Sequence, residues 1–222
     1  MKESGGAATW VPDRPDVDSL RAAARGCQGC DLYRDATQTV FSSGPANASA
    51  VLVGEQPGDI EDLRGEPFVG PAGRLLRRAM GDAGLDLAST YLTNAVKHFK
   101  HHLDSRGKRR IHDKPAPTEI RACHPWLRAE LAVVRPRIVV ALGATAAQAI
   151  AGPSFRVTKE GGRLLPWPDP AALTDEPEDE PPPAFLATIH PSAVLRADDR
   201  DRAYDGLVQD LTVAAHALVN EP

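Results

Sequence analysis

Four short apolar segments recur along the chain, and each is followed by glycine, proline or polar residues. They begin at Ala50, Thr90, Arg137 and Ala184, and they read AVLVGEQPG, TYLTNAVKH, RIVVALG and AFLATIHPS. Each segment is rich in Val, Ile, Leu or Thr, and its apolar residues are continuous rather than alternating. This pattern is typical of parallel strands that are buried on both faces. It predicts the four strands of a mainly parallel sheet.

Segments with helical spacing lie between and around these strands. They cover Val17 to Arg25, Pro71 to Ala83, Thr118 to Val133, Ala144 to Ala151, and about Asp199 to Val219. Pro71 suits the first turn of a helix, and Thr118 followed by Glu119 suits a helix start. The alternation of strands and helices predicts an α/β fold, which we expect to be a three-layer αβα sandwich around a central four-stranded sheet.

The chain of 222 residues has the usual length of one domain. We assign residues 16–222 to that domain and residues 1–15 to a flexible N-terminal arm. The segment PDPAALTDEPEDEPPP, from Pro168 to Pro183, is acidic and rich in proline, so we expect a surface loop there.

The composition is that of an ordinary soluble globular protein, with 42% hydrophobic and 25% charged residues. The first residues contain no apolar run, and no segment approaches the roughly 20 apolar residues that cross a bilayer. We therefore expect a cytoplasmic protein with no membrane partner, and a monomer by default. The net charge of −4 does not exclude DNA, because a local basic strip can contact phosphates.

Three cysteines, Cys27, Cys30 and Cys123, make a disulfide framework improbable in a reducing compartment. A CxxC pair alone can be a redox pair, half of a metal site, or a coincidence. The third cysteine favours a metal, and a histidine is the usual substitute for a fourth cysteine. His98 is the leading candidate because it follows a strand end. The competing candidates are His101, His102 and His124. Spacing alone does not distinguish Zn²⁺ from an iron–sulfur cluster.

Polar residues that could bind a ligand or take part in catalysis follow the predicted strands. Ligands of parallel sheets bind at these strand ends. Glu55 and Gln56 stand in the turn GEQPG, Asn94 ends the second strand, and His190 ends the fourth. Each has an ordinary explanation, such as a simple turn or a cap, and Phe68 in EPFVG can be plain core. Together they suit recognition of a flipped nucleobase and cleavage of its glycosidic bond.

The segment Gly107 to His112, GKRRIH, places three cations next to a histidine in an otherwise acidic chain. Such a run is commonly a solvated surface. It can also bind phosphates, or bring the histidine to a reaction. Its position within residues 98–114, directly after a predicted strand end, favours the last two interpretations.

Six motifs occur in an order that resembles the iron–sulfur uracil-DNA glycosylases. They are CxxC from Cys27, GEQPGDIED, EPFVGPAG, TNAVK, CHPWL from Cys123, and HPS. The common members of that family carry GEAPG, and they have a cysteine where this chain has His98. GEQPG together with KRRIH resembles the X-type branch, whose members bind uracil-containing DNA and stay covalently joined to it through the histidine of this loop.

The resemblance implies a uracil-DNA glycosylase fold, in which residues 98–114 are a basic loop insertion. It also implies a [4Fe–4S] cluster with Cys3His ligation. Its ligands would be Cys27, Cys30, His98 and Cys123.

For the substrate, the resemblance implies that Phe68 stacks on uracil, that Asn94 reads its Watson–Crick edge, and that His190 donates to the charge developing on O2. The remaining expected substrate contacts are Gly54, Gln56 and Asp59. Phosphate contacts are expected from Lys97, Lys108, Arg109, Arg110 and Ser192.

We expect His112 to attack the sugar cation at C1′ before water does, because a neutral imidazole is a competent nucleophile. Glu55 would orient water in an ordinary glycosylase, and here it would accept the remaining ring proton. The partner would be uracil-containing DNA, preferably single-stranded, in the cytoplasm at the bacterial nucleoid. The alternatives are a conventional glycosylase that turns over, a DNA-binding module that bears a cluster without catalysis, and a cysteine-based redox protein.

Overall fold

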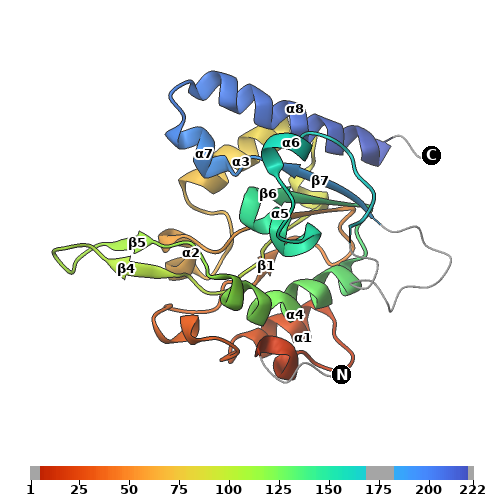
Figure 1. The fold of residues 1–222 in the computed structure, drawn as a ribbon. Coiled ribbons are helices and arrows are strands. Elements are labelled where there is room, and N and C mark those ends of the chain that lie inside the picture. The colour runs from red at the N-terminus through yellow and green to blue at the C-terminus, as the bar shows by residue number, and fades with distance from the viewer. Residues whose placement is uncertain (1–5, 169–182, 220–222) are drawn as a thin grey trace.

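Five strands form the central sheet, in the order β1-β3-β2-β6-β7 (Figure 1). This structure is a computed structural model, and it describes residues 6–168 and 183–219. The four predicted strands are present and parallel: β2 (Ala50–Gly54), β3 (Thr90–Asn94), β6 (Ile138–Leu142) and β7 (Ala184–Thr188). The predicted count of four was wrong, because β1 (Ser42–Ser43) pairs antiparallel with β3. A strand of two serines is too short and too polar to produce a hydrophobic pattern in the sequence.

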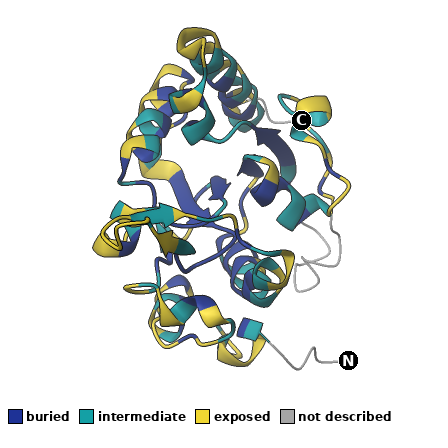
Figure 2. Ribbon diagram, turned by 60° about the vertical axis from the view of Figure 1, so that its left-hand side comes forward, coloured by how far each residue is buried: buried dark blue, intermediate teal, exposed yellow. Residues whose placement is uncertain are grey.

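Helices cover both faces of the sheet and make the predicted three layers. The helices α1 (Val17–Ala24), α4 (Pro117–Val134) and α5 (Ala144–Ala151) form one outer layer. The other layer contains α3 (Pro71–Asp82), α7 (Pro191–Arg196) and α8 (Arg200–Val219). All five predicted helical segments are confirmed to within two residues. Figure 2 shows the buried sheet between these partly exposed layers.

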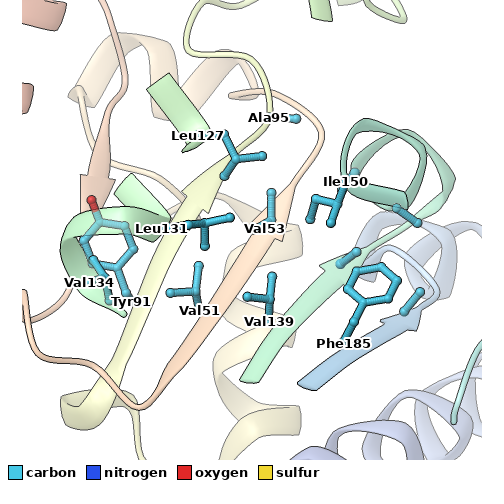
Figure 3. Close-up of a cluster of buried hydrophobic side chains, with 14 of the residues drawn as sticks. Val51, Val53, Tyr91, Ala95, Leu127, Leu131, Val134, Val139, Ile150 and Phe185 are labelled. Atoms are coloured by element: carbon cyan, nitrogen blue, oxygen red, sulfur yellow. The ribbon is translucent and has the colours of Figure 1, made fainter. Parts of the chain in front are cut away.

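Two apolar cores follow from the alternation of side chains along each strand. Val51 and Val53 point to one face, where they pack with Leu127, Leu131 and other residues of α4 and α5 (Figure 3). Leu52 points to the opposite face and packs with α3 and α8. Because both faces are buried, the strands read as continuous apolar segments in the sequence.

The N-terminal segment packs on the protein instead of forming the flexible arm that we expected. Residues Gly6–Trp10 form the 3-10 helix η1, and Ala7 is only 1% exposed. A Cβ on Gly6 would lie 2.7 Å from the carbonyl oxygen of Ala122 in α4, so only glycine permits this approach. Residues 1–5 lie outside the described residues.

The predicted basic loop, residues 98–114, contains a β-hairpin. Its strands are β4 (His101–Leu103) and β5 (Arg110–His112), and they form a separate two-stranded sheet. His101 lies directly opposite His112 in the antiparallel register. The hairpin projects from the body of the molecule beside α2 (Asp59–Arg64), as Figure 1 shows.

Three further short helices complete the described chain: η2 (Asp31–Arg34), η3 (Leu87–Ser89) and α6 (Val157–Glu160). Most of the acidic segment expected as a surface loop, residues 169–182, lies outside the described residues. Among the helices that the structure describes, none is long and apolar enough to span a bilayer.

Candidate active site at the strand ends

Gly54, Asn94 and Phe68 meet at the carboxyl ends of β2 and β3. Gly54 lies beside Asn94 in the parallel register. A Cβ on Gly54 would lie 2.3 Å from Asn94 Oδ1 and 2.7 Å from Phe68 Cζ, so both side chains reach over the glycine backbone. Asn94 is 3% exposed and Phe68 is 5% exposed. Three of the predicted substrate contacts are therefore brought together, and the Gly54 position tolerates no side chain.

The backbone at Phe68 is strained, which sequence reasoning did not reveal. Phe68 has a φ of 57°, in the left-handed region that bulky residues avoid. The turn is closed by Gly73 of α3, because a Cβ there would lie 1.9 Å from the Phe68 carbonyl oxygen. Strained residues of this kind gather at ligand sites, where the surrounding structure holds them in place. The Gly73 in the motif EPFVGPAG is the signal of this close approach.

His190 is oriented by a cap at the start of α7. Its Nδ1 accepts a hydrogen bond from the Ser192 backbone N–H at 3.1 Å and lies 2.8 Å from Ser192 Oγ. A backbone N–H can only donate, so the neutral ring carries its proton on Nε2. Burial lowers the pKa of His190 to about 4, with smaller contributions from Arg196 and His112. His190 is thus a neutral donor at physiological pH, and Ser192, expected at phosphate, instead fixes the ring.

His112 and Glu55 face each other close to the turn that follows β2. His112 Nε2 lies 3.4 Å from Glu55 Oε1, which is within reach of an ion pair but longer than a good hydrogen bond. The His112 side chain is 49% exposed, while that of Glu55 is 22% exposed. The charge of His112 also affects the pKa of His190. The three predicted catalytic residues therefore lie in one region.

Gln56 holds the base of the hairpin, which differs from its predicted role. Its Nε2 donates to the carbonyl oxygens of Lys100 at 3.2 Å and Asp113 at 3.0 Å, and its Oε1 accepts from the Lys100 N–H at 3.1 Å. Gln56 is 7% exposed. The amide that we expected at the base or sugar is thus occupied in joining the two ends of the hairpin to the turn after β2.

Arg110 anchors the same hairpin to α2. Its Nε donates to Asp59 Oδ1 and its Nη1 to Asp62 Oδ2, each at 2.6 Å, and Nη1 also reaches Thr37 Oγ1 at 3.0 Å. The guanidinium lies 5.4 Å from the centre of the Phe99 ring. This arrangement does not support the predicted phosphate contact of Arg110 or the predicted substrate contact of Asp59, because the two residues neutralise each other.

Lys108 and Arg109 are the cations of this motif that face solvent. They lie in the turn of the hairpin, where their backbone N–H groups donate to Asp104 Oδ1 at 2.9 and 3.3 Å. Gly107 completes the turn with a φ of 67°, a conformation that glycine adopts readily. The side chains of Lys108 and Arg109 are exposed, and their contact with phosphates stays a prediction.

Lys97 does not face solvent, contrary to its expected role at phosphate. It is 1% exposed, and its ammonium forms an ion pair with the fully buried Glu130. In this conformation the ammonium has no path to a DNA backbone. The sequence did contain an indication that Glu130 is buried and needs a cationic partner. Glu130 lies on the same face of its helix as the apolar Leu127, Leu131 and Val134.

The three cysteines gather in the small core between the N-terminal segment and α4. Cys27 Sγ accepts from Trp126 Nε1, and Cys123 Sγ accepts from the Lys97 backbone N–H, each at 3.3 Å. Burial raises the pKa of Cys123 to about 12, and nearby Cys27 and Cys30 add to this shift. Thiols that share one apolar core and accept N–H hydrogen bonds fit an iron–sulfur cluster, whose sulfur ligands accept such hydrogen bonds.

His98, the expected fourth ligand, is 5% exposed, and its Nε2 lies 2.9 Å from Thr39 Oγ1. This ring nitrogen is therefore already engaged. Among the side chains that the structure describes, no group of three or more His, Cys, Asp or Glu residues is arranged to hold a metal ion. The cysteines fit a cluster by their chemistry and surroundings, while ligation by His98 stays a prediction.

Comparisons with known proteins show the family of this chain. Residues 41–212 match the sequence profile of the uracil DNA glycosylase superfamily. The chain belongs to this superfamily. It is 37% identical to a type-4 uracil-DNA glycosylase of Archaeoglobus fulgidus over 134 residues, which span 60% of this chain and 63% of that protein. It is 32% identical to a type-4 uracil-DNA glycosylase of Thermotoga maritima over 181 residues, which span 81% of this chain and 83% of that protein.

Proposed function

We propose that this protein is a uracil-DNA glycosylase that excises uracil and then stays covalently joined to the DNA through His112. Superfamily membership and the likeness to type-4 uracil-DNA glycosylases support the excision. The covalent step is carried by one observation, which is the approach of His112 Nε2 to Glu55 on an anchored hairpin at the pocket.

The strand ends carry the groups that a flipped uracil requires. Phe68 offers an aromatic face for stacking, and Asn94 offers an amide with both a donor and an acceptor. Cytosine presents a different pattern at the same edge, so it would leave the buried Asn94 amide without its partners. A buried polar site rejects such a mismatched ligand strongly.

Excision begins as the bond between C1′ of the deoxyribose and the uracil nitrogen breaks. The electron pair leaves with uracil, which becomes an anion, and the sugar becomes an oxocarbenium ion. His190 donates from Nε2–H toward uracil O2, where negative charge develops. Its ring is neutral and already oriented by Ser192, so it stabilises the charge without first having to reorganise.

The lone pair of His112 Nε2 then forms a bond to C1′, and the ring becomes an N-alkyl imidazolium. Its remaining proton sits on Nδ1, which points away from Nε2, and it is lost to solvent. This geometry favours an electrostatic role for Glu55 over the proton transfer that the sequence suggested. The carboxylate lies 3.4 Å from the ring nitrogen of His112, and it would also face the sugar cation that this nitrogen attacks. The product is a neutral N-alkyl imidazole, which is a poor leaving group.

We propose that the hairpin also holds the DNA. Lys108 and Arg109 face solvent at its turn and pair with phosphates beside the flipped nucleotide. Arg110 and Gln56 would not contact the DNA. Arg110 holds the hairpin against α2, and Gln56 holds it against the turn after β2.

A [4Fe–4S] cluster would be held by Cys27, Cys30 and Cys123, with His98 as the fourth ligand that we propose. Through these residues it would join the segment between α1 and η2 to α4. The surrounding residues shield it: Trp126 donates to Cys27, and the Lys97 backbone donates to Cys123. No step of the excision passes through this group.

The test uses a labelled single-stranded oligonucleotide with one uracil, which is mixed with the protein and run on a denaturing gel. We expect a band shifted by the mass of the protein, which survives heat and detergent and is absent with a thymine oligonucleotide. His112→Ser should remove the shifted band and leave strands that break in alkali. His102→Ser is the matched control, because His102 is an exposed histidine of the same hairpin.

The other outcomes separate the alternatives. Strands that break in alkali without a shifted band in the native protein would indicate a conventional glycosylase that turns over. Reversible, salt-dependent binding with neither product would indicate a DNA-binding module without catalysis. The same assay with a duplex oligonucleotide measures the expected preference for single strands.

A further inference from the structure

A buried ion pair lies directly beneath the strand end that carries Asn94. We propose that Lys97, supported by Glu130, is a positioning residue that fixes Asn94 and thereby controls the rate and selectivity of base excision. This inference rests on the proposed reading of uracil by Asn94. Lys97 is 1% exposed and Glu130 is fully buried, so neither residue can act on DNA directly.

The ammonium of Lys97 uses its three donors within the protein. Nζ donates to the backbone carbonyl oxygen of Asn94 at 2.9 Å, to Thr93 Oγ1 at 2.6 Å, and to Glu130 Oε2. The ring of Phe41 lies 5.0 Å from the same ammonium. One side chain thus binds the last two residues of β3.

The Asn94 carbonyl depends on this donor because the sheet offers none. The Ala95 N–H donates to Gly54 on β2, so the C=O of the preceding residue points to the opposite side, toward β1. β1 spans only two residues, and its register with β3 ends at the pair Ser42 and Thr93. Lys97 therefore takes the place of the missing strand at Asn94.

Glu130 holds the ammonium in position. Its Oε1 accepts from the Tyr91 hydroxyl at 3.0 Å and from Thr93 Oγ1 at 2.9 Å, while its Oε2 accepts from Lys97. The network therefore joins three positions of β3 and the following turn to α4. Every polar group in it has a partner.

Stability alone does not account for this ion pair. Replacement of a buried ion pair by matched apolar groups is often neutral or stabilising, because desolvation of the charges offsets their attraction. What the pair adds is a fixed direction for the Asn94 backbone, and with it the direction of the amide above Gly54. A small misplacement of a group that orients the substrate can reduce the rate about 100-fold.

Lys97 also connects Asn94 to the cysteine pocket. Its backbone N–H donates to Cys123 Sγ at 3.3 Å, and its carbonyl accepts from the Val40 N–H at 2.9 Å. The side chain therefore faces the base-reading residue while the backbone faces the proposed cluster. A variant of the ion pair must therefore also be checked for any change in cluster absorption.

The experiment compares the native protein with the double variant Lys97→Met/Glu130→Gln, which removes both charges at similar volume. We expect the variant to fold, to keep any cluster absorption of the native protein, and to bind uracil DNA with a half-saturating concentration within about threefold. The single-turnover rate constant of uracil release should fall about 10- to 100-fold. The rate of cytosine excision should not fall by the same factor. The ratio of the uracil rate to the cytosine rate, which measures selectivity, should therefore decrease.

Tyr204→Phe is the control. It removes a hydroxyl that donates to Asp82 and so joins α8 to α3, outside the network of Lys97 and Glu130. We expect its release rate to stay within about threefold of the native protein. If the double variant does not fold, the isosteric Glu130→Gln replaces it, with an expected decrease of several-fold.

A folded double variant with the native rate and selectivity would overturn the positioning role. Asn94→Ala, measured in parallel, separates this failure from failure of the proposed function. If Asn94→Ala excises uracil normally, the reading of the base by Asn94 is wrong. If Asn94→Ala is inactive while the double variant is fully active, only the inference about Lys97 is wrong.

Discussion

Gln56→Leu tests whether Gln56 serves the hairpin or the substrate. The variant keeps the side-chain volume but removes three hydrogen bonds to the backbone of Lys100 and Asp113. Each such bond contributes about 1 kcal/mol net, and loss of a partner leaves backbone groups that water satisfies only in part. The docked hairpin should therefore lose about 2 to 4 kcal/mol relative to an undocked one. This range corresponds to a factor of roughly 30 to 800 in the docking equilibrium.

The assay measures two products from the same reaction. Shifted bands on a denaturing gel report the adduct through His112, and cleavage in alkali reports uracil release. Undocking displaces His112 but leaves Asn94 and His190 in place, so adduct formation should slow at least about 10-fold while release changes much less. Abasic DNA without a bound protein should then accumulate.

Gln148→Leu is the control, because Gln148 also donates to a backbone carbonyl, that of Phe155, but lies on α5. It should change neither product. If Gln56→Leu slowed adduct formation and uracil release by the same factor, the role of Gln56 in holding the hairpin would be refuted. That result would indicate that Gln56 contacts the base or sugar in the complex, as the sequence had suggested.

Two further predictions concern stability. Gly73→Ala should destabilise the protein by more than about 2 kcal/mol and slow uracil release, because its Cβ would collide with the Phe68 carbonyl. Gly81→Ala, in the same helix with open space around it, should be stabilising by up to about 1 kcal/mol, and urea unfolding measures both. His190 has its pKa lowered to about 4, whereas the unfolded chain titrates near 6.5. This difference in pKa contributes at most about 3 kcal/mol to the free energy of unfolding, and residual exposure reduces that value. The contribution is fully present above pH 6.5 and is lost as the pH falls toward 4. Unfolding free energy should therefore fall less steeply with acid in His190→Gln, and equal slopes would contradict this assignment.

The layers of the fold could be predicted because each element carries a strong local signal. Continuous apolar segments such as Ala50–Gly54 report burial on both faces, and helical spacing reports the covering helices. β1 could not be predicted, since two serines join the sheet only through their contact with β3. The hairpin could not be predicted either, because its strands have three residues each. It is held in place by Gln56 and by the ion pairs of its own Arg110 with the carboxylates of α2.

The sequence could predict which candidate residues lie together at the strand ends, but not the hydrogen bonds and ion pairs that each of them makes. Strand ends and motifs located Gly54, Asn94 and Phe68, which the structure brings together. Lys97 and Arg110 were expected at phosphate because an exposed and a buried cation look the same in a sequence. Their acidic partners lie 33 and 48 residues away, so only the tertiary structure reveals the ion pairs.

The order of residues in RRIH follows from the geometry of a strand. Side chains two apart in β5 lie on the same face, so Arg110 and His112 both point toward the body of the protein. Arg110 meets the carboxylates of α2 and His112 meets Glu55, while the cations before them occupy the exposed turn. One short segment thus contains an arginine that anchors the hairpin, the proposed nucleophile, and two exposed cations that we propose to contact phosphate. The insertion of a single residue between Arg110 and His112 would turn one of them to the opposite face and separate the anchor from the chemistry.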